Sequence, residues 1–276
     1  MKRLISGILA LSIFAFAGTA SVSAAPKTSN AENKVQIVVG ATPSPHAEIL
    51  EAIKPELESR GIDLKIVVFT DYVQPNLALD GGELDANYFQ HKPYLDDFNA
   101  NKRTNLVSAG SVHYEPLGIF AGKIKDINGL KKGSVIAVPN DTTNEARALL
   151  LLEAQGIIKI RKDAGLSATV FDITENPKKV VIKELEAAQL ARSLRDVSLA
   201  VINGNYALDA GLNASTDAIA KEEKDSLAAS TFANIIAVRS GDENREEIKI
   251  LMEVLQSDFT RKFIEDTYKG AVVPVF

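Results

Sequence analysis

A run of small and β-branched apolar residues leads through a short polar loop into an apolar segment, and this stretch constrains the fold more than any other. Residues 134–138 read Ser-Val-Ile-Ala-Val, which predicts a buried strand. The apolar segment predicts a helix that begins near Thr142, because Thr142 and Glu145 have the spacing of a capping box. Gly156 is placed to end it. A buried strand followed at once by such a helix is typical of an α/β fold.

Arg147 lies in the first turns of this predicted helix, on the same face as Leu150 and Leu151. An arginine among apolar neighbours needs an anion, and free N–H groups at a helix start add to its attraction for a carboxylate or phosphate. Two interpretations remain open. Arg147 binds the anionic group of a ligand, or it forms an internal salt bridge with Asp141 or another acidic residue.

The beginning of the chain has a similar pattern. Residues 34–40 and 64–69 predict strands, and residues 46–60 between them predict a helix that ends at Gly61. A strand, a helix and a strand in this order predict a parallel unit with a right-handed crossover. The basic, glycine-containing segment 123–132 is expected to cross from this first unit to the second.

Aromatic and polar side chains are mixed between Tyr72 and Tyr94. We expect a short strand at 84–87, with Phe89 and His91 just after its end. Ligands of open α/β sheets bind beyond the carboxyl ends of the strands, so these side chains predict a ligand pocket. The alternative is a surface aromatic cluster or ordinary core.

Three asparagines stand at predicted loops or strand ends, namely Asn144, Asn205 and Asn234. Their amides can bond both charged ends of a small zwitterion, while Arg147 would hold its carboxylate. The aromatic pocket suits an apolar or polarisable side chain such as a thioether.

The sequence contains no nucleotide-binding glycine loop, no serine-hydrolase motif and no metalloprotease motif, so we expect no enzymatic activity and no cofactor. It also has no cysteine, which excludes disulfides, a thiol nucleophile and cysteine-ligated metals. No two of its three histidines have the spacing of metal ligands on a helix, and no metal is expected. A zinc site that uses His91 and His113, with Glu115, remains the alternative.

The first residues have the pattern of a targeting segment. Lys2 and Arg3 precede an apolar run, and small residues follow it, so residues 1–24 are expected to be a cleaved signal peptide and residues 25–33 a flexible leader. Loss of 24 residues with two positive charges would leave 252 residues and change the net charge from −5 to −7. An acidic mature chain predicts no nucleic-acid partner and no binding to an anionic membrane.

Six segments of the chain resemble the NlpA lipoprotein family, the methionine-binding lipoproteins of bacterial ABC uptake systems. They occur in the family's order across the mature chain and read GATPSPHAEILE from Gly40, DANYFQHKPYL at 85–95, VHYEPLGIF at 112–120, IAVPNDTTNEARALLLLEAQGII at 136–158, ELEAAQLARSL at 184–194 and VINGNYALDAGL at 201–212.

The resemblance implies an α/β periplasmic-binding-protein fold of type II, in which each of two lobes is a mixed, mostly parallel sheet flanked by helices. Lobe 1 would be residues 34–121 with 237–276, and lobe 2 residues 122–236. The ligand would be enclosed between the lobes and delivered by a monomeric protein to an inner-membrane ABC permease. The implied ligand is methionine, as the L or the D enantiomer; a methionine-containing dipeptide or another amino acid is the alternative.

Family ligand residues also match positions in this chain. The resemblance implies that Arg147 binds the ligand's carboxylate and that two asparagines bind the amino-acid backbone, with Asn144 as a further contact. The implied contacts to the side chain and backbone are Tyr72, Phe89, His91, Tyr94, Asn205 and Asn234.

The chain departs from the family at two places. Members usually carry a lipobox cysteine, whereas here Gly18 is followed by Thr19 and no cysteine occurs. We therefore expect a soluble periplasmic protein without a lipid anchor. Residues 141–143 read Asp-Thr-Thr where the family often has a proline, and we expect binding to be kept because Thr142 can cap the helix.

Overall fold

The structure is a computed structural model, and it describes residues 34–223 and 230–276. The expected signal peptide and leader lie outside the described residues. Within these two ranges, no helix combines the length and the apolar character needed to cross a bilayer.

The first sheet has six strands in the order β13-β4-β12-β3-β1-β2. β1 pairs in parallel with both β2 and β3, whereas β12 pairs antiparallel with β3 and β4. The parallel unit predicted at the start of the chain is therefore present. The strands are β1 (Val35–Ala41), β2 (Ile62–Val68), β3 (Ala86–His91), β4 (Leu106–Tyr114), β12 (Asn234–Arg239) and β13 (Val273–Pro274).

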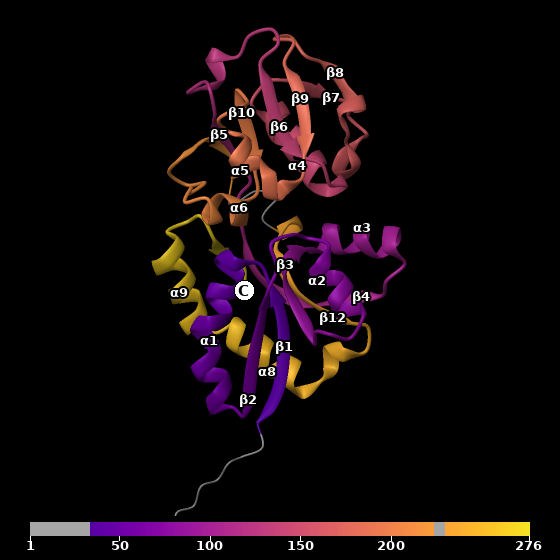
Figure 1. Ribbon diagram of the computed structural model, residues 1–276, viewed down its shortest axis with the longest axis vertical. Helices are drawn as coiled ribbons and strands as arrows, with labels where there is room; N and C mark the ends of the chain where they lie inside the picture. The colour runs from indigo at the N-terminus through magenta and orange to yellow at the C-terminus, as the bar shows by residue number, and fades with distance from the viewer. Residues whose placement is uncertain (1–33, 224–229) are drawn as a thin grey trace, which may run out of the picture. The chain divides into compact units, whose positions relative to one another are not determined.

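The main core of this sheet forms where α1 packs with α8 and α9 (Figure 1). In α1, Ile49, Leu50, Ile53 and Leu57 are fully buried, which is the three-and-four spacing of an amphipathic helix. The helices around the sheet are α1 (Glu48–Ser59), α2 (Gln74–Asp80), α3 (Lys92–Lys102), α8 (Glu246–Leu255) and α9 (Asp258–Tyr268). A short turn, η1 (Pro43–Ala47), in which Ser44 has an extended backbone, precedes α1 and carries the buried His46.

The second sheet has five strands in the order β11-β5-β10-β6-β9. β6 pairs in parallel with β10 and β9, and β5 is antiparallel to β10 and β11. Its strands are β5 (Gly118–Ala121), β6 (Val135–Pro139), β9 (Val181–Leu185), β10 (Leu199–Ile202) and β11 (Ala218–Lys221). Its helices are α4 (Thr142–Ala154), α5 (Leu190–Ser193) and α6 (Gly204–Asp209).

Short elements complete the described chain. β7 (Lys159–Ile160) and β8 (Ile173–Glu175) form a two-stranded sheet. Short 3-10 turns are η2 (Ile127–Gly129), η3 (Gly165–Ser167), η4 (Val170–Asp172), η5 (Ala187–Gln189) and η6 (Asp242–Asn244).

The chain changes sheets earlier than the expected boundaries. β5 belongs to the second sheet, so the first change lies between Tyr114 and Gly118 and not after 121. β12 belongs to the first sheet from Asn234, three residues before the expected return at 237. The segment 123–132 therefore connects β5 and β6, two strands of the second sheet, and does not cross from the first sheet to the second. Antiparallel pairing of β5 with β10 decides the first position, and composition alone does not show such a pairing.

The strand expected at 84–87 was also misplaced. β3 runs from Ala86 to His91 with all six residues buried, so Phe89 and His91 lie on the strand and not after it. Its polar residues are tolerated because Asn87 and Gln90 exchange side-chain hydrogen bonds with the buried Asn76 of α2. A buried amide cluster of this kind satisfies groups that would otherwise make a strand read as a loop.

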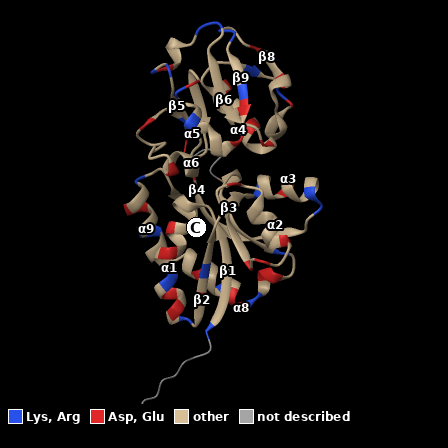
Figure 2. Ribbon diagram, viewed as in Figure 1, with Lys and Arg blue, Asp and Glu red and all other residues tan. Residues whose placement is uncertain are grey.

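Charged residues lie mainly on the helices and loops. Figure 2 shows Lys and Arg interspersed with Asp and Glu along α1, whereas the strands of the first sheet are largely uncharged in this view. This mixture of signs on α1 is unlike the basic face of a nucleic-acid-binding helix.

Candidate functional site

All eight residues singled out from the sequence line one cavity with an empty volume of about 350 Å³. The cavity wall includes β3, α3 and the start of β12 on the side of the first sheet. On the side of the second sheet it includes α4 and the start of α6. The predicted residues in its wall are Tyr72, Phe89, His91, Tyr94, Asn144, Arg147, Asn205 and Asn234. Four residues that sequence reasoning had not proposed as ligand contacts complete the wall, namely Gln90, Glu115, Asn203 and Gly204.

One part of the wall is aromatic. The ring of Tyr72 lies 5.7 Å from that of Phe89, 5.8 Å from that of Tyr94 and 5.0 Å from that of Tyr206, measured between centroids. The Tyr94 hydroxyl donates to the Tyr72 carbonyl at 3.0 Å, and the Tyr72 hydroxyl donates to Asn205 Oδ1 at 2.5 Å. These bonds fix the rings, so this part of the wall presents preformed aromatic surface beside polar side chains.

Arg147 has an internal partner, and that partner is Glu222. Its Nε donates to Glu222 Oε1 at 2.7 Å and its Nη2 to Glu222 Oε2 at 2.5 Å, a two-point pairing of guanidinium and carboxylate. The side chains of Arg147 and Glu222 are only 5% and 10% exposed. Burial alone would lower the pKa of Arg147, but the Glu222 carboxylate reverses this and raises it. The internal salt bridge considered from the sequence is therefore present.

Asp141, the acid named as a partner for Arg147, has a different role. Its side chain caps α4 by accepting from the backbone N–H of Asn144 at 3.0 Å. The expected capping box of Thr142 and Glu145 is wrong, because Thr142 is already the first helical residue and Glu145 instead accepts from the Val170 amide at 3.0 Å. The expected end of the helix is correct, since Gly156 follows the C-cap with φ +67°.

The Arg147 guanidinium has partners besides Glu222. Nη2 also donates to the Glu115 carbonyl at 2.8 Å, and the Tyr114 side chain is hydrogen-bonded to Arg147 as well. The guanidinium carbon lies 4.5 Å from the centre of the Phe232 ring, which covers one of its faces. Arg147 is thus held in place by one acid while its side chain borders the cavity.

Two buried amide atoms in the wall lack partners among the described residues. Asn203 Oδ1, an acceptor, and Asn205 Nδ2, a donor, are both shielded from solvent and form no hydrogen bond. The other ends of these amides are fixed, because Asn203 Nδ2 donates to Asn144 Oδ1 at 2.9 Å and Asn205 Oδ1 accepts from Tyr72. Buried polar atoms are nearly always paired, so one donor and one acceptor at one cavity indicate a ligand that carries both.

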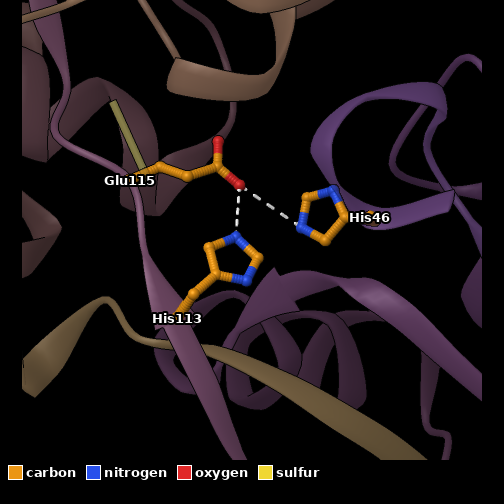
Figure 3. A group of neighbouring side chains, drawn as sticks. All are labelled: His46, His113 and Glu115. Atoms are coloured by element: carbon orange, nitrogen blue, oxygen red, sulfur yellow. Dashed lines mark hydrogen bonds and ion pairs between the residues drawn. The ribbon is translucent and has the colours of Figure 1, made fainter. Parts of the chain in front are cut away.

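His91 and His113, the zinc ligands of the alternative considered from the sequence, do not belong to one group of potential metal ligands among the described residues. His91 Nε2 lies 3.3 Å from Asn144 Oδ1, and its Nδ1 accepts from the Tyr94 amide at 3.2 Å. Instead, His46 joins His113 and Glu115, with their ligand atoms within 4.8 Å of one another (Figure 3).

This histidine–glutamate cluster has the geometry of a hydrogen-bonded network. His113 Nε2 and Glu115 Oε1 are 2.7 Å apart, whereas two ligands of a tetrahedral zinc ion lie about 3.3 Å apart, given bonds of roughly 2.0–2.2 Å. The remaining ring nitrogens are also bonded, His113 Nδ1 to the Tyr88 hydroxyl and His46 Nδ1 to Thr42 Oγ1. The cluster as it stands does not fit zinc.

Comparison with known proteins assigns the chain to a family. The NlpA lipoprotein family model matches residues 37–276. The "Methionine-binding lipoprotein MetQ" of Bacillus subtilis is 41% identical over 100% of this chain and 99% of its own length. The "D-methionine-binding lipoprotein MetQ" of Salmonella typhimurium is 43% identical over 87% of both chains.

A solved structure is similar as well. It is that of a nutrient-binding protein from Burkholderia cenocepacia bound to methionine, and it is 47% identical to this chain. The match covers 87% of this chain and 100% of that one, with a TM-score of 0.83. The α/β fold expected from the sequence is thus that of solved substrate-binding proteins.

Proposed function

The chain belongs to the NlpA lipoprotein family, and from this membership we propose that it is the substrate-binding component of an ABC importer that captures methionine or a closely related amino acid. It would deliver the ligand to a membrane permease and would itself catalyse no reaction. The observation that carries the proposal is the pair of unpartnered buried amide atoms beside Arg147 and the aromatic wall. An amino acid supplies an acceptor, a donor and a side chain at one carbon atom.

We place the ligand's carboxylate at Arg147 and Asn205. The Arg147 guanidinium and the unpartnered Nδ2 of Asn205 border the same cavity, and a carboxylate accepts from N–H groups of both kinds. The salt bridge with Glu222 uses Nε and one N–H of Nη2, so it does not occupy all five N–H groups of the guanidinium. The ligand's side chain would then contact the aromatic wall, where a thioether gains roughly 0.3–1.5 kcal/mol for each sulfur–aromatic contact.

We propose that the two sheets are the cores of two lobes and that a monomer encloses the ligand by lobe closure. Binding residues from both sheets would make the closed state the ligand-stabilised one.

Identification of the ligand tests this function. The protein is purified without added amino acids, its mass is measured under native conditions, and any bound molecule is released and identified. We expect a bound mass equal to that of methionine. A protein that is ligand-free, and that stays so after incubation with methionine and a mixture of the other amino acids, would remove the basis of the proposal.

Phe89→Ala is expected to change which side chains are accepted more than how strongly an amino acid is held. Phe89 contributes its ring to the wall and makes no hydrogen bond to the cavity's polar groups. We expect methionine affinity to fall by about tenfold and the preference for methionine over leucine to shrink. Competition between the two amino acids for the variant measures this. An unchanged preference would show that Phe89 does not contact the side chain.

The relatives are named lipoproteins, which indicates an exported protein. We propose that this chain is exported to the periplasm and is not lipid-anchored, since its sequence has no cysteine to carry the lipid. Osmotic shock followed by detergent phase separation tests the proposal. Recovery in the aqueous phase is expected, and recovery in the detergent phase would contradict it.

A further inference from the structure

Glu115 is a buried acid whose role neither the sequence reasoning nor the family relationship explains. It follows β4, is 6% exposed and borders the cavity. His113 Nε2 donates to its Oε1 at 2.7 Å, and His46 Nε2 lies 3.4 Å from the same oxygen (Figure 3). The backbone amide of Asn205 bonds the carboxyl group as well.

None of these neighbours supplies a positive charge near neutral pH. Burial lowers the pKa of His46 to about 4 and that of His113 to about 3, so both rings are neutral. Arg147 bonds the backbone carbonyl of Glu115, while its charge is paired with Glu222. Among the described residues, the Glu115 carboxylate therefore has donors but no cation bonded to its side chain, an arrangement that is costly unless a cation arrives.

The carboxylate also has room for another donor. An ionised carboxyl group has about four acceptor positions, and His113 and the Asn205 amide occupy two of them, whereas the Nε2 of His46 is bonded to Asn234 Oδ1 at 3.0 Å. The unpartnered Oδ1 of Asn203 offers a further acceptor on the same cavity. A group with several N–H donors and a positive charge satisfies both residues, and an ammonium group has three donors.

We propose that Glu115 binds the α-ammonium group of the captured amino acid, with Asn203 Oδ1 as a second acceptor and with His113 as a positioning residue. This inference rests on the proposed function and assigns the part of the site that selects a zwitterion over a simple carboxylic acid. The carboxylate and ammonium groups of the ligand then occupy separate, oppositely charged parts of the wall, at Arg147 and Glu115.

The titration of Glu115 gives this assignment a pH dependence. Burial raises the pKa of Glu115, and His46, Arg147 and the Asn205 amide oppose the rise. The ionised form binds the ammonium group, so methionine affinity should be constant above the raised pKa and fall as the pH decreases through it. The other titratable groups that interact with Glu115 are His113 of β4, Tyr88 of β3, Tyr72, Tyr268 and Asp209.

A pair of ligands isolates the contribution of the ammonium group to the binding affinity. Methionine and 4-(methylsulfanyl)butanoate have the same carboxylate and thioether, and only methionine has the ammonium group. Calorimetry would give the affinity of both for the wild type, Glu115→Gln and a control, Glu145→Gln. Glu145 is also buried, with its carboxylate bonded to the Val170 amide outside the cavity. Circular dichroism would establish that each variant is folded.

For Glu115→Gln we expect methionine affinity to fall by about thirtyfold or more, and affinity for the desamino ligand to change by less than about threefold. Glu145→Gln should retain the wild-type affinity for both. Equal losses for the two ligands, or undiminished methionine binding, would overturn the assignment while leaving the proposed function intact. A wild type that binds neither ligand would refute both proposals.

The wild type provides a second measurement that needs no variant. We expect it to bind methionine at least about tenfold more tightly than the desamino ligand at neutral pH, and this ratio to shrink as the pH decreases. A ratio near one at every pH would contradict a role for Glu115 in binding the ammonium group, whatever the folding of the variants.

Discussion

Arg147→Ala is expected to weaken methionine binding by about thirtyfold or more and to destabilise the protein at the same time. Binding falls because the ligand's carboxylate loses the guanidinium that borders the cavity. Stability falls because the Glu222 carboxylate, 10% exposed, loses its cation. Breaking a buried ion pair by removing one partner costs about 3–5 kcal/mol. Calorimetry and thermal unfolding measure the two effects separately.

A double variant separates these two consequences. Arg147→Ala with Glu222→Gln removes both charges, and the introduced glutamine side chain can still accept from the Tyr114 hydroxyl and the Leu117 amide through its one oxygen. We expect much of the lost stability to return, whereas binding stays weak. If methionine binding also returned, the loss in the single variant would have come from distortion, and Arg147 would not be a contact of the carboxylate.

Asn205→Asp is expected to weaken methionine binding by about a hundredfold, although it changes the side chain by a single group. The oxygen that accepts from Tyr72 is kept, and the unpartnered Nδ2 donor becomes a second, negatively charged oxygen. A donor for the ligand's carboxylate is thus replaced by a like charge, and such juxtapositions cost several kcal/mol. Calorimetry with methionine provides the affinity.

Two further variants are the controls for Asn205→Asp. Asn205→Ala removes the donor without adding charge and should cost only about tenfold. Asn213→Asp adds the same charge beyond α6, where the Oδ1 atom already accepts from the Ser215 amide, and should leave binding unchanged. Equal affinities for the aspartate and alanine variants at position 205 would show that no carboxylate lies beside Nδ2.

The parts of the fold that were predictable from the sequence are those in which local pattern and burial agree. The strand β6 and the helix α4 were expected because β-branched residues precede an apolar helix that ends at Gly156. β3 was placed too early because Asn87 and Gln90 make it look polar. Their partner, Asn76, lies on α2, and only the folded chain brings the three amides together.

The same distinction applies to the site. Residue type and place in the chain were enough to select eight residues that line one cavity. The partner of Arg147 could not be read from local sequence, because Glu222 is 75 residues away. His46 lies in a turn before α1, and its Nε2 is 3.4 Å from Glu115 Oε1. The helix expected at 46–60 gave no reason to place His46 beside Glu115. Asn203 could have been predicted as a site residue from the sequence, since it follows the same buried strand as Asn205.

Calorimetric titration of the ligand-free mature protein with L-methionine tests the central claim most directly. The protein is unfolded, dialysed and refolded to remove any bound molecule, and its fold is checked before titration. We predict one site per chain with a dissociation constant of about 1 μM or lower, and a rise in melting temperature on binding. Absence of both the heat of binding and the rise in melting temperature at millimolar methionine would contradict the assignment of this chain as a methionine-binding protein.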